Sequence, residues 1–147
     1  MTELIFLKLG GSLITDKNKP YTPRLDKLNS LALEIKTILD STPDIQLFLG
    51  HGSGSFAHVP AKKYGTRDGL TDPKDLKRSL GSVKDYWKGF AEVRFQAAEL
   101  NRFVMQALVN AGVPAISFPP SSTLVTKNGK VEHSDTVAIR RALEARV

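Results

Sequence analysis

Apolar residues follow two repeating patterns along this chain, one typical of strands and the other of amphipathic helices. Short apolar runs at 4–9, 45–49 and 113–118 predict three strands, and the first should be buried on both faces. Between these runs, apolar residues recur every three or four positions over 24–40 and 83–111, which predicts two helices. The chain therefore alternates strand and helix.

Smaller elements are predicted in the rest of the chain. Asn128-Gly129 is typical of a tight turn, here between two short strands at 123–126 and 130–133. A final helix follows, with Ser134 or Asp135 as its cap. The basic, glycine-containing segment 62–84 is predicted to consist of turns.

Two glycines concern the predicted long helix. Gly89 lies inside it, where glycine costs about 1 kcal/mol of helix propensity relative to alanine, so Gly89 is a candidate kink. Gly112 follows its last turn, with Pro114 two residues beyond, which is typical of a helix C-cap. The aromatic residues of this helix are interpreted as core: Tyr86, Trp87, Phe90 and Phe95.

The alternation of strand and helix favours a parallel sheet with helices on both faces. Residues 1–147 are therefore predicted to form an α/β structure, a three-layer αβα sandwich with a mainly parallel sheet.

Composition narrows the possible classes of protein. The chain has 147 residues, 41% of them hydrophobic, which is enough for one domain with its own core. It contains no cysteine, which excludes disulfides, cysteine zinc sites, iron–sulfur clusters and thiol catalysis. Its apolar runs are too short to span a membrane, and its first residues lack the basic region of a secretory signal. We expect a cytoplasmic protein with no membrane partner.

The net charge of +6 leaves two interpretations open. Eight Lys and Arg residues accompany four Asp residues between positions 62 and 88. Such a run is typical of a solvated surface or of a protein that binds an anionic small molecule. No nucleic-acid recognition motif accompanies the charge, so no nucleic-acid partner is predicted.

A glycine turn follows each of the first two predicted strands, at the end where ligands bind in open α/β sheets. In the first turn, Gly10-Gly11-Ser12, the missing Cβ atoms let backbone N–H groups approach phosphate oxygens. Lys8 precedes this turn within an otherwise apolar strand. It is either an edge-strand lysine that reaches solvent or a clamp for phosphate.

The second turn is Gly52-Ser53-Gly54, flanked by His51 and His58. Its spacing imitates a dinucleotide-binding fingerprint, but Asp72, the acid at the required distance, follows no predicted strand. The turn is therefore interpreted as an anion-binding nest. His58, expected in the first turn of the next helix, is either a structural histidine or a group that faces the bound anion.

Three other kinds of site are disfavoured. The Gly-x-Gly spacing around Ser53 and Ser55 differs from a nucleophile elbow, so a Ser–His nucleophile is not predicted. The three histidines lack the spacing of zinc ligands, and no metal site is predicted. Neither turn is followed by the Gly-Lys-Ser/Thr of a Walker A loop.

Together, the two turns resemble those of the amino acid kinase superfamily and, within it, the isopentenyl phosphate kinase family. The resemblance rests on residues 8–17 and 51–58 and continues through 61–64, 100–101 and 112–122. The turn with two histidines is its most specific part. The resemblance implies an amino acid kinase-like fold and ATP-dependent phosphorylation of isopentenyl phosphate, a small phosphorylated isoprenoid, with Mg²⁺ bound to the nucleotide.

The resemblance also implies roles for single residues. The expected nucleotide-phosphate contacts are Lys8, Gly10, Gly11, Ser12 and Gly54. The expected contacts of the acceptor phosphate are Gly52, Ser53 and His58, and the expected catalytic residues are Lys8, Lys17 and His58. The isoprenoid tail needs an apolar pocket, which Phe90, Val93 and Phe95 are expected to wall.

The chain departs from the family pattern in two ways. Ser53 and Ala57 stand where glycine is usual, and their Cβ atoms require backbone that avoids positive φ, which we interpret as tuning. Family members also continue into a second half that carries the adenine and ribose pocket. Residues 1–147 are thus predicted to be the N-terminal, acceptor-binding part of an amino acid kinase domain, apparently truncated, without the C-terminal nucleotide-binding part.

Two alternatives remain beside isopentenyl phosphate kinase. Fosfomycin-type kinases share much of the second turn, and a non-catalytic anion-binding remnant would keep the same residues. The superfamily resemblance also implies a homodimer, built across the long helix, in full-length members.

Overall fold

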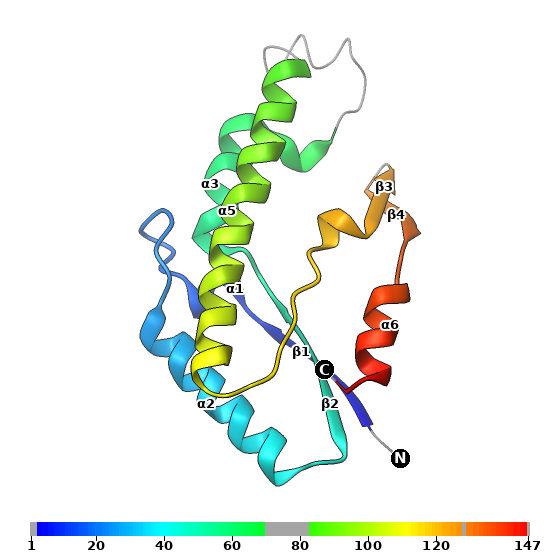
Figure 1. Ribbon diagram of the computed structural model, residues 1–147. Helices are drawn as coiled ribbons and strands as arrows, with labels where there is room; N and C mark the ends of the chain where they lie inside the picture. Colours follow the sequence, from blue (N-terminus) through cyan, green and yellow to red (C-terminus); the bar gives the residue numbers. More distant parts are fainter. Residues whose placement is uncertain (1–2, 70–82, 128, 147) are drawn as a thin grey trace.

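The computed structural model describes residues 3–69, 83–127 and 129–146, and the structural statements below concern these residues. Two of the predicted strands, β1 (Glu3–Leu9) and β2 (Ile45–His51), pair in parallel. Glu3 lies opposite Ile45 and Leu9 lies opposite His51, so the carboxyl ends of both strands meet at one edge (Figure 1). This register brings the two glycine turns together.

Helices and a hairpin surround this pair of strands. The two long predicted helices are confirmed, as are the antiparallel hairpin and the final helix. The remaining elements are α1 (Gly11–Ile14), α2 (Leu25–Ser41), α3 (Gly54–Tyr64), η1 (Thr66–Asp68), α5 (Val83–Asn110), η2 (Pro120–Ser122), β3 (Leu124–Lys127), β4 (Lys130–Ser134) and α6 (Val137–Glu144). Most of the segment predicted to be turns, 62–84, lies outside the described residues.

The predicted C-cap of α5 has the expected geometry, whereas the N-cap of α6 is Thr136, one residue after the predicted Asp135. Gly112 has a φ of +76°, its N–H donates to the Val109 carbonyl and the Val113 N–H donates to the Leu108 carbonyl, as in a Schellman cap. Asp135 Oδ1 accepts the Val137 N–H at 3.0 Å, which satisfies one of the first amides of α6.

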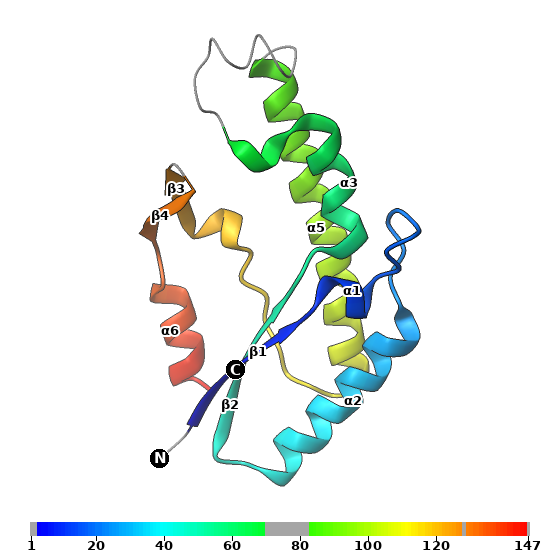
Figure 2. The same cartoon turned by 180° about the vertical axis from the view of Figure 1, so that it is seen from behind.

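The hydrophobic core lies on one side of the strand pair, between it and helices α2 and α5. Figures 1 and 2 show these helices on one side and α6 on the other, which gives the three layers of the predicted sandwich. The buried cluster consists of Leu9, Ile14, Leu28, Ala32, Ile35, Phe56, Leu100, Val104, Ala107, Leu108 and Val113.

The prediction that the first strand is buried on both faces is wrong. Leu4 is 38% exposed and Phe6 is 73% exposed, and in β1 only Leu9 is buried. The outer face of the strand pair is covered only near the amino ends of the strands. There α6 reaches it, and Gln46 Nε2 donates to the Leu143 carbonyl at 2.6 Å. The rest of that face is open, and the Phe6 and Phe48 rings meet on it with centroids 5.3 Å apart.

The third predicted strand, 113–118, is also not a strand. Within the described part of the chain no strand pairs with it, and Pro114 has no N–H to donate to a neighbour. Side chains of α5 hold this segment instead: the Ser117 hydroxyl donates to Asn101 Oδ1 at 2.9 Å, and Arg94 Nε donates to the Ser121 hydroxyl at 3.0 Å. The segment therefore runs back along α5 as extended chain (Figure 2).

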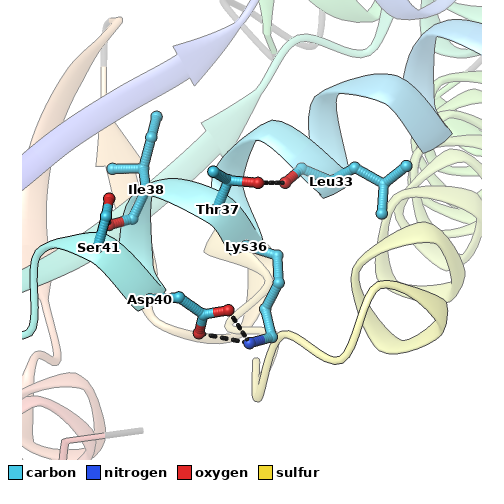
Figure 3. Close-up of polar contacts among 6 residues, drawn as sticks. All are labelled: Leu33, Lys36, Thr37, Ile38, Asp40 and Ser41. Atoms are coloured by element: carbon cyan, nitrogen blue, oxygen red, sulfur yellow. Dashed lines mark hydrogen bonds and ion pairs between the residues drawn. The ribbon is translucent and has the colours of Figure 1, made fainter.

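Helix α2 joins the two strands and is stabilised mainly by its buried side. On its exposed side the Lys36 ammonium pairs with the Asp40 carboxylate, and the Thr37 hydroxyl donates to the Leu33 carbonyl at 2.9 Å (Figure 3). An exposed ion pair at this spacing contributes only about 0.3–0.5 kcal/mol. Burial of the inner stripe, which includes Ile35, contributes more.

The prediction that the aromatic residues of α5 lie in the hydrophobic core is only partly correct. Tyr86 is 7% exposed, whereas Trp87 is 52%, Phe90 42% and Phe95 62% exposed. The Trp87 ring meets both Tyr86 and Phe90 edge to face, at centroid distances of 5.5 and 5.6 Å. The amino-terminal part of α5 thus extends beyond the core and carries an aromatic cluster that solvent reaches.

Gly89 allows α3 and α5 to pack closely. A Cβ atom at this position would lie 2.2 Å from Tyr64 Cβ and 2.5 Å from Tyr64 Cγ. The helix continues through Gly89, so the residue serves this contact with the last turn of α3. Gly65, the residue after Tyr64, ends α3 with a φ of +61°. In the same turn of α3, a hydrogen bond with the Tyr64 side chain and the nearby Glu92 carboxylate raise the pKa of Lys63 above its ordinary value.

Replacing Gly89 tests this helix contact. Although alanine favours helix by about 1 kcal/mol, Gly89→Ala is expected to lower the free energy of unfolding by about 1–3 kcal/mol, because Tyr64 must move. Urea denaturation measures the change. Ala91→Gly, at an exposed position of the same helix, is the matched control for propensity. A Gly89→Ala variant more stable than the unsubstituted protein would contradict the packing role.

Candidate functional site

The two glycine turns touch each other through their backbones. A Cβ atom on Gly11 would lie 2.6 Å from the Gly54 nitrogen, and one on Gly52 would lie 2.7 Å from the Gly11 nitrogen. Gly54 has a φ of +49° and equally little room. Because side chains are excluded on both sides, the first amides of α1 and α3 lie close together, and these amides have no acceptor within their own helices. The junction suits an anion.

A single hydroxyl joins the two turns. Thr15 follows α1 and is fully buried, with 0% exposure. Its Oγ1 donates to the Gly11 carbonyl at 2.7 Å and accepts the Ser55 N–H at 3.1 Å. Reasoning from the sequence missed Thr15, because one of its two partners, Ser55, lies forty positions further along the chain.

Ser53 and Ala57 fit their positions in the backbone. Ser53 has φ −80° and ψ −13°, a conformation that any L-residue adopts. Ala57 lies within α3 and is buried at 8% exposure. Neither Cβ atom therefore strains the backbone.

Lys8 lies on the open face of the strand pair, one residue before the core residue Leu9. It lines a shallow groove of about 280 Å³ with Phe6, Phe48, Gly50 and His51. Its ammonium thus reaches solvent without crossing the core, as both interpretations of this lysine require.

Lys17 is exposed in a short loop that begins at Thr15. A bridge between Thr15 and Pro23 closes the loop, and the Asp16 N–H donates to the Thr22 carbonyl at 2.9 Å. The loop therefore starts directly at the junction of the two turns. Within the described ranges, no hydrogen bond or ion pair neutralises Lys8 or Lys17.

His58 lies further along its helix than expected. Helix α3 begins at Gly54, so His58 is in its second turn and not in the first. The side chain is exposed, and no hydrogen bond joins it to another described residue. The structure brings Gly11, Gly52 and Gly54 into contact, whereas no hydrogen bond or ion pair among the described residues joins the side chains of Lys8, Lys17 or His58 to them.

The other histidine of the motif has a structural partner. Asn101 Oδ1 accepts the Ser117 hydroxyl, so the Asn101 amide nitrogen faces His51 Nε2, 3.1 Å away. His51 Nε2 is then the acceptor, and the ring proton lies on Nδ1, 3.2 Å from the Gly52 carbonyl oxygen. This chain of bonds fixes the carboxyl end of β2 against α5. No local sequence pattern predicts these bonds, because His51, Asn101 and Ser117 are widely separated in the chain.

The described residues contain neither a cluster of metal ligands nor a membrane-spanning helix. Among residues 3–69, 83–127 and 129–146, no three His, Asp or Glu side chains gather as ligands of a metal ion would. None of the helices in the same ranges is long and apolar enough to cross a membrane.

The fold and the site define a class: an α/β protein in which two joined glycine turns close the carboxyl edge of parallel strands, beside unpaired lysines. The chain belongs to the amino acid kinase family, whose profile it matches over residues 3–147. This confirms the predicted fold class and family.

Named relatives are isopentenyl phosphate kinases. The enzyme of Methanocaldococcus jannaschii is 36% identical over 145 residues, which cover 96% of this chain and 52% of that protein. The enzyme of Methanothermobacter thermautotrophicus is 36% identical over 143 residues, which cover 96% of this chain and 49% of that protein. A solved isopentenyl phosphate kinase structure superimposes with a TM-score of 0.82 at 34% identity, over 99% of this chain and 55% of the other. The chain spans about half the length of the curated relatives it matches.

The contact between the turns can be tested by adding a single methyl group. Gly11→Ala is expected to lower the free energy of unfolding by about 1–3 kcal/mol, because the new Cβ meets backbone atoms that cannot rotate away. Gly10→Ala is the matched control: its Cβ meets nothing within 4 Å and its φ is −62°, so a gain of about 0.4–1 kcal/mol is expected. Equal effects of the two substitutions in chemical denaturation would contradict the contact.

Proposed function

We propose that this chain carries the acceptor side of an enzyme that phosphorylates isopentenyl phosphate to isopentenyl diphosphate with ATP. The observation that carries the proposal is the junction of two glycine turns, in a chain that is 36% identical to isopentenyl phosphate kinases over 96% of its length. Backbone amides without internal partners suit phosphoryl oxygens, and two turns in contact suit two phosphoryl groups that must react with each other.

The proposed reaction needs charge and positioning more than acid–base chemistry. An oxygen of the acceptor phosphate forms a bond to the γ-phosphorus, the bond from that phosphorus to the bridging oxygen breaks, and ADP leaves. Since the attacking oxygen is already anionic, no general base is required. Catalysis then depends on neutralising the charge of the transferring group. Lys8 and Lys17 are the proposed sources of positive charge, because no described residue neutralises either of them.

The proposed binding roles divide between the two turns. Lys8 and the first turn, together with Gly54, hold the nucleotide phosphates. Gly52, Ser53 and His58 hold the acceptor phosphate, with the imidazole as a hydrogen-bond donor. The exposed position of His58 on α3 supports this role, because an incoming ligand can reach the ring.

The isoprenoid tail is proposed to lie along the aromatic cluster of α5. Phe90 and Val93 are three positions apart and share a helix face, whereas Phe95 is about 140° further round from Phe90 at about 100° per residue. The proposed wall therefore narrows to Phe90 and Val93, with the exposed Trp87 beside them.

The nucleotide-binding part is proposed to come from the region that relatives have beyond this match. Relatives are about twice as long as the matched region. An open sheet face with Phe6 and Phe48 in contact supports the proposal, because apolar surface of this kind is normally covered. Mg²⁺ enters only with the nucleotide, whose phosphates supply ligands of the kind this ion prefers.

Two further features of the proposal concern the whole protein. A cytoplasmic enzyme fits the cysteine-free sequence. A homodimer across α5 is supported by an open groove of about 250 Å³ between α2 and α5, beside which Leu33 is 60% exposed.

The activity is tested with ATP and isopentenyl phosphate, in the chain alone and with the separately produced carboxyl-terminal half of the Methanocaldococcus jannaschii relative. Isopentenyl diphosphate is the expected product when both parts are present. Fosfomycin is the competing acceptor, and preferential phosphorylation of fosfomycin would favour the fosfomycin-type alternative. Binding of isopentenyl phosphate without product in either mixture would indicate a non-catalytic anion-binding protein.

His58→Ala tests the acceptor role within the same assay. Loss of a hydrogen bond to a charged phosphate costs about 1.5–3 kcal/mol, so kcat/KM for isopentenyl phosphate should fall about 10- to 150-fold. His133→Ala, at an exposed histidine of the hairpin, is the matched control and should leave kcat/KM unchanged. Equal kinetics of the two variants would remove His58 from the site.

A further inference from the structure

We propose that Thr15 is a positioning residue, whose hydroxyl holds the two phosphate-binding turns at a fixed separation. The inference rests on the proposed function for its link to phosphoryl transfer. The joining of the turns by the hydroxyl is a property of the fold and can be tested without any ligand.

The Thr15 hydroxyl acts both as a hydrogen-bond donor and as a hydrogen-bond acceptor. Thr15 Oγ1 donates its proton to the Gly11 carbonyl at 2.7 Å, and its lone pair accepts the Ser55 N–H at 3.1 Å. The first contact belongs to the turn after β1 and the second to the turn after β2. Because Thr15 is fully buried, water cannot replace either bond.

Thr15 also acts as the cap that α3 otherwise lacks. Ser53, at the N-cap position, makes no side-chain hydrogen bond to the helix. The Ser55 N–H is one of the first amides of α3 and would have no partner within its helix. Thr15 supplies the acceptor from a different turn, so the start of α3 is anchored to the first turn.

The methyl group of Thr15 has a separate role. A Cβ atom on Gly54 would lie 2.7 Å from Thr15 Cγ2 and 2.1 Å from Thr15 Oγ1, so this side chain fills the space beside Gly54. The hydroxyl sets the hydrogen bonds and the methyl fills the gap. Serine at position 15 keeps the hydroxyl that makes the hydrogen bonds, whereas valine keeps the shape of threonine without the hydroxyl.

The loop of Lys17 starts from the same residue. The bridge between Thr15 and Pro23 closes that loop two positions before Lys17. The start of the loop that carries Lys17 and the spacing of the two turns therefore both depend on the buried Thr15. Since displacement of reacting groups by about 1 Å can cost about 100-fold in rate, a residue of this kind acts on the reaction without touching the substrate.

Ser55 provides a matched control within the same junction. Its Oγ is buried and has no hydrogen-bond partner among the described residues, whereas its N–H is bonded to Thr15. Ser55→Ala and Thr15→Val each remove one buried hydroxyl from the junction of the turns. Only the Thr15 hydroxyl joins the two turns, so only its removal should separate them.

The test compares Thr15→Val, Thr15→Ser and Ser55→Ala by calorimetric titration with isopentenyl phosphate and by the assay with the complementing half. Thr15→Val should weaken binding about tenfold and lower kcat, since it leaves the buried Ser55 N–H unpaired and removes the side-chain bond to the Gly11 carbonyl, which then keeps only the Thr15 N–H. Thr15→Ser should restore both to within about twofold, and Ser55→Ala should change neither by more than that. Unchanged binding and kcat in Thr15→Val, or equal losses in Thr15→Val and Ser55→Ala, would overturn the inference.

Hydrogen exchange of the unsubstituted chain provides a test that needs no variant to fold and no ligand to bind. The Ser55 amide should exchange at least about ten times more slowly than the Gly54 amide, because only the former is bonded to Thr15. Equal exchange rates would overturn the inference. Slow exchange at Ser55, in a chain that binds no phosphate ligand, would reject the proposed function while keeping the joined turns.

Discussion

The contact between the two glycine turns is the constraint on which the rest of the site depends. Gly11 lies against Gly52 and Gly54, and none of these three glycines has room for a side chain. This approach requires parallel strands in the register that sets Leu9 opposite His51, so that both turns leave the sheet at one edge. Bonds made by Thr15 within the junction, and by His51 and Asn101 beside it, then fix the turns against the helices.

The one-sided core explains how a lysine can stand in an apolar strand. Leu9 belongs to the buried cluster, and its neighbour Lys8 points to the opposite, open face. Because successive side chains of β1 point to opposite faces, Leu9 packs in the core while Lys8, one residue earlier, lies on the open face. The same open face carries the Phe6–Phe48 contact.

Sequence patterns predicted what depends on local chemistry. Helical spacing predicted α2 and α5, and Gly11, Gly52 and Gly54 marked the turns because close backbone approach excludes other residues at these three positions. The segment 113–118 was predicted wrongly, since a strand exists only when another strand pairs with it. Thr15 and the bonds between His51, Asn101 and Ser117 left no local signal, because each depends on residues that only folding brings together. Exposure of Trp87 depends in the same way on what packs against α5.

The central claim is that the two turns bind phosphoryl groups as one unit, and an amide NMR titration of the chain with isopentenyl phosphate tests it most directly. The account predicts that amide signals of residues 10–12 and 52–54 shift together and follow a single dissociation constant. Shifts confined to one turn would contradict the joined unit, and the absence of shifts at both turns would contradict phosphate binding itself.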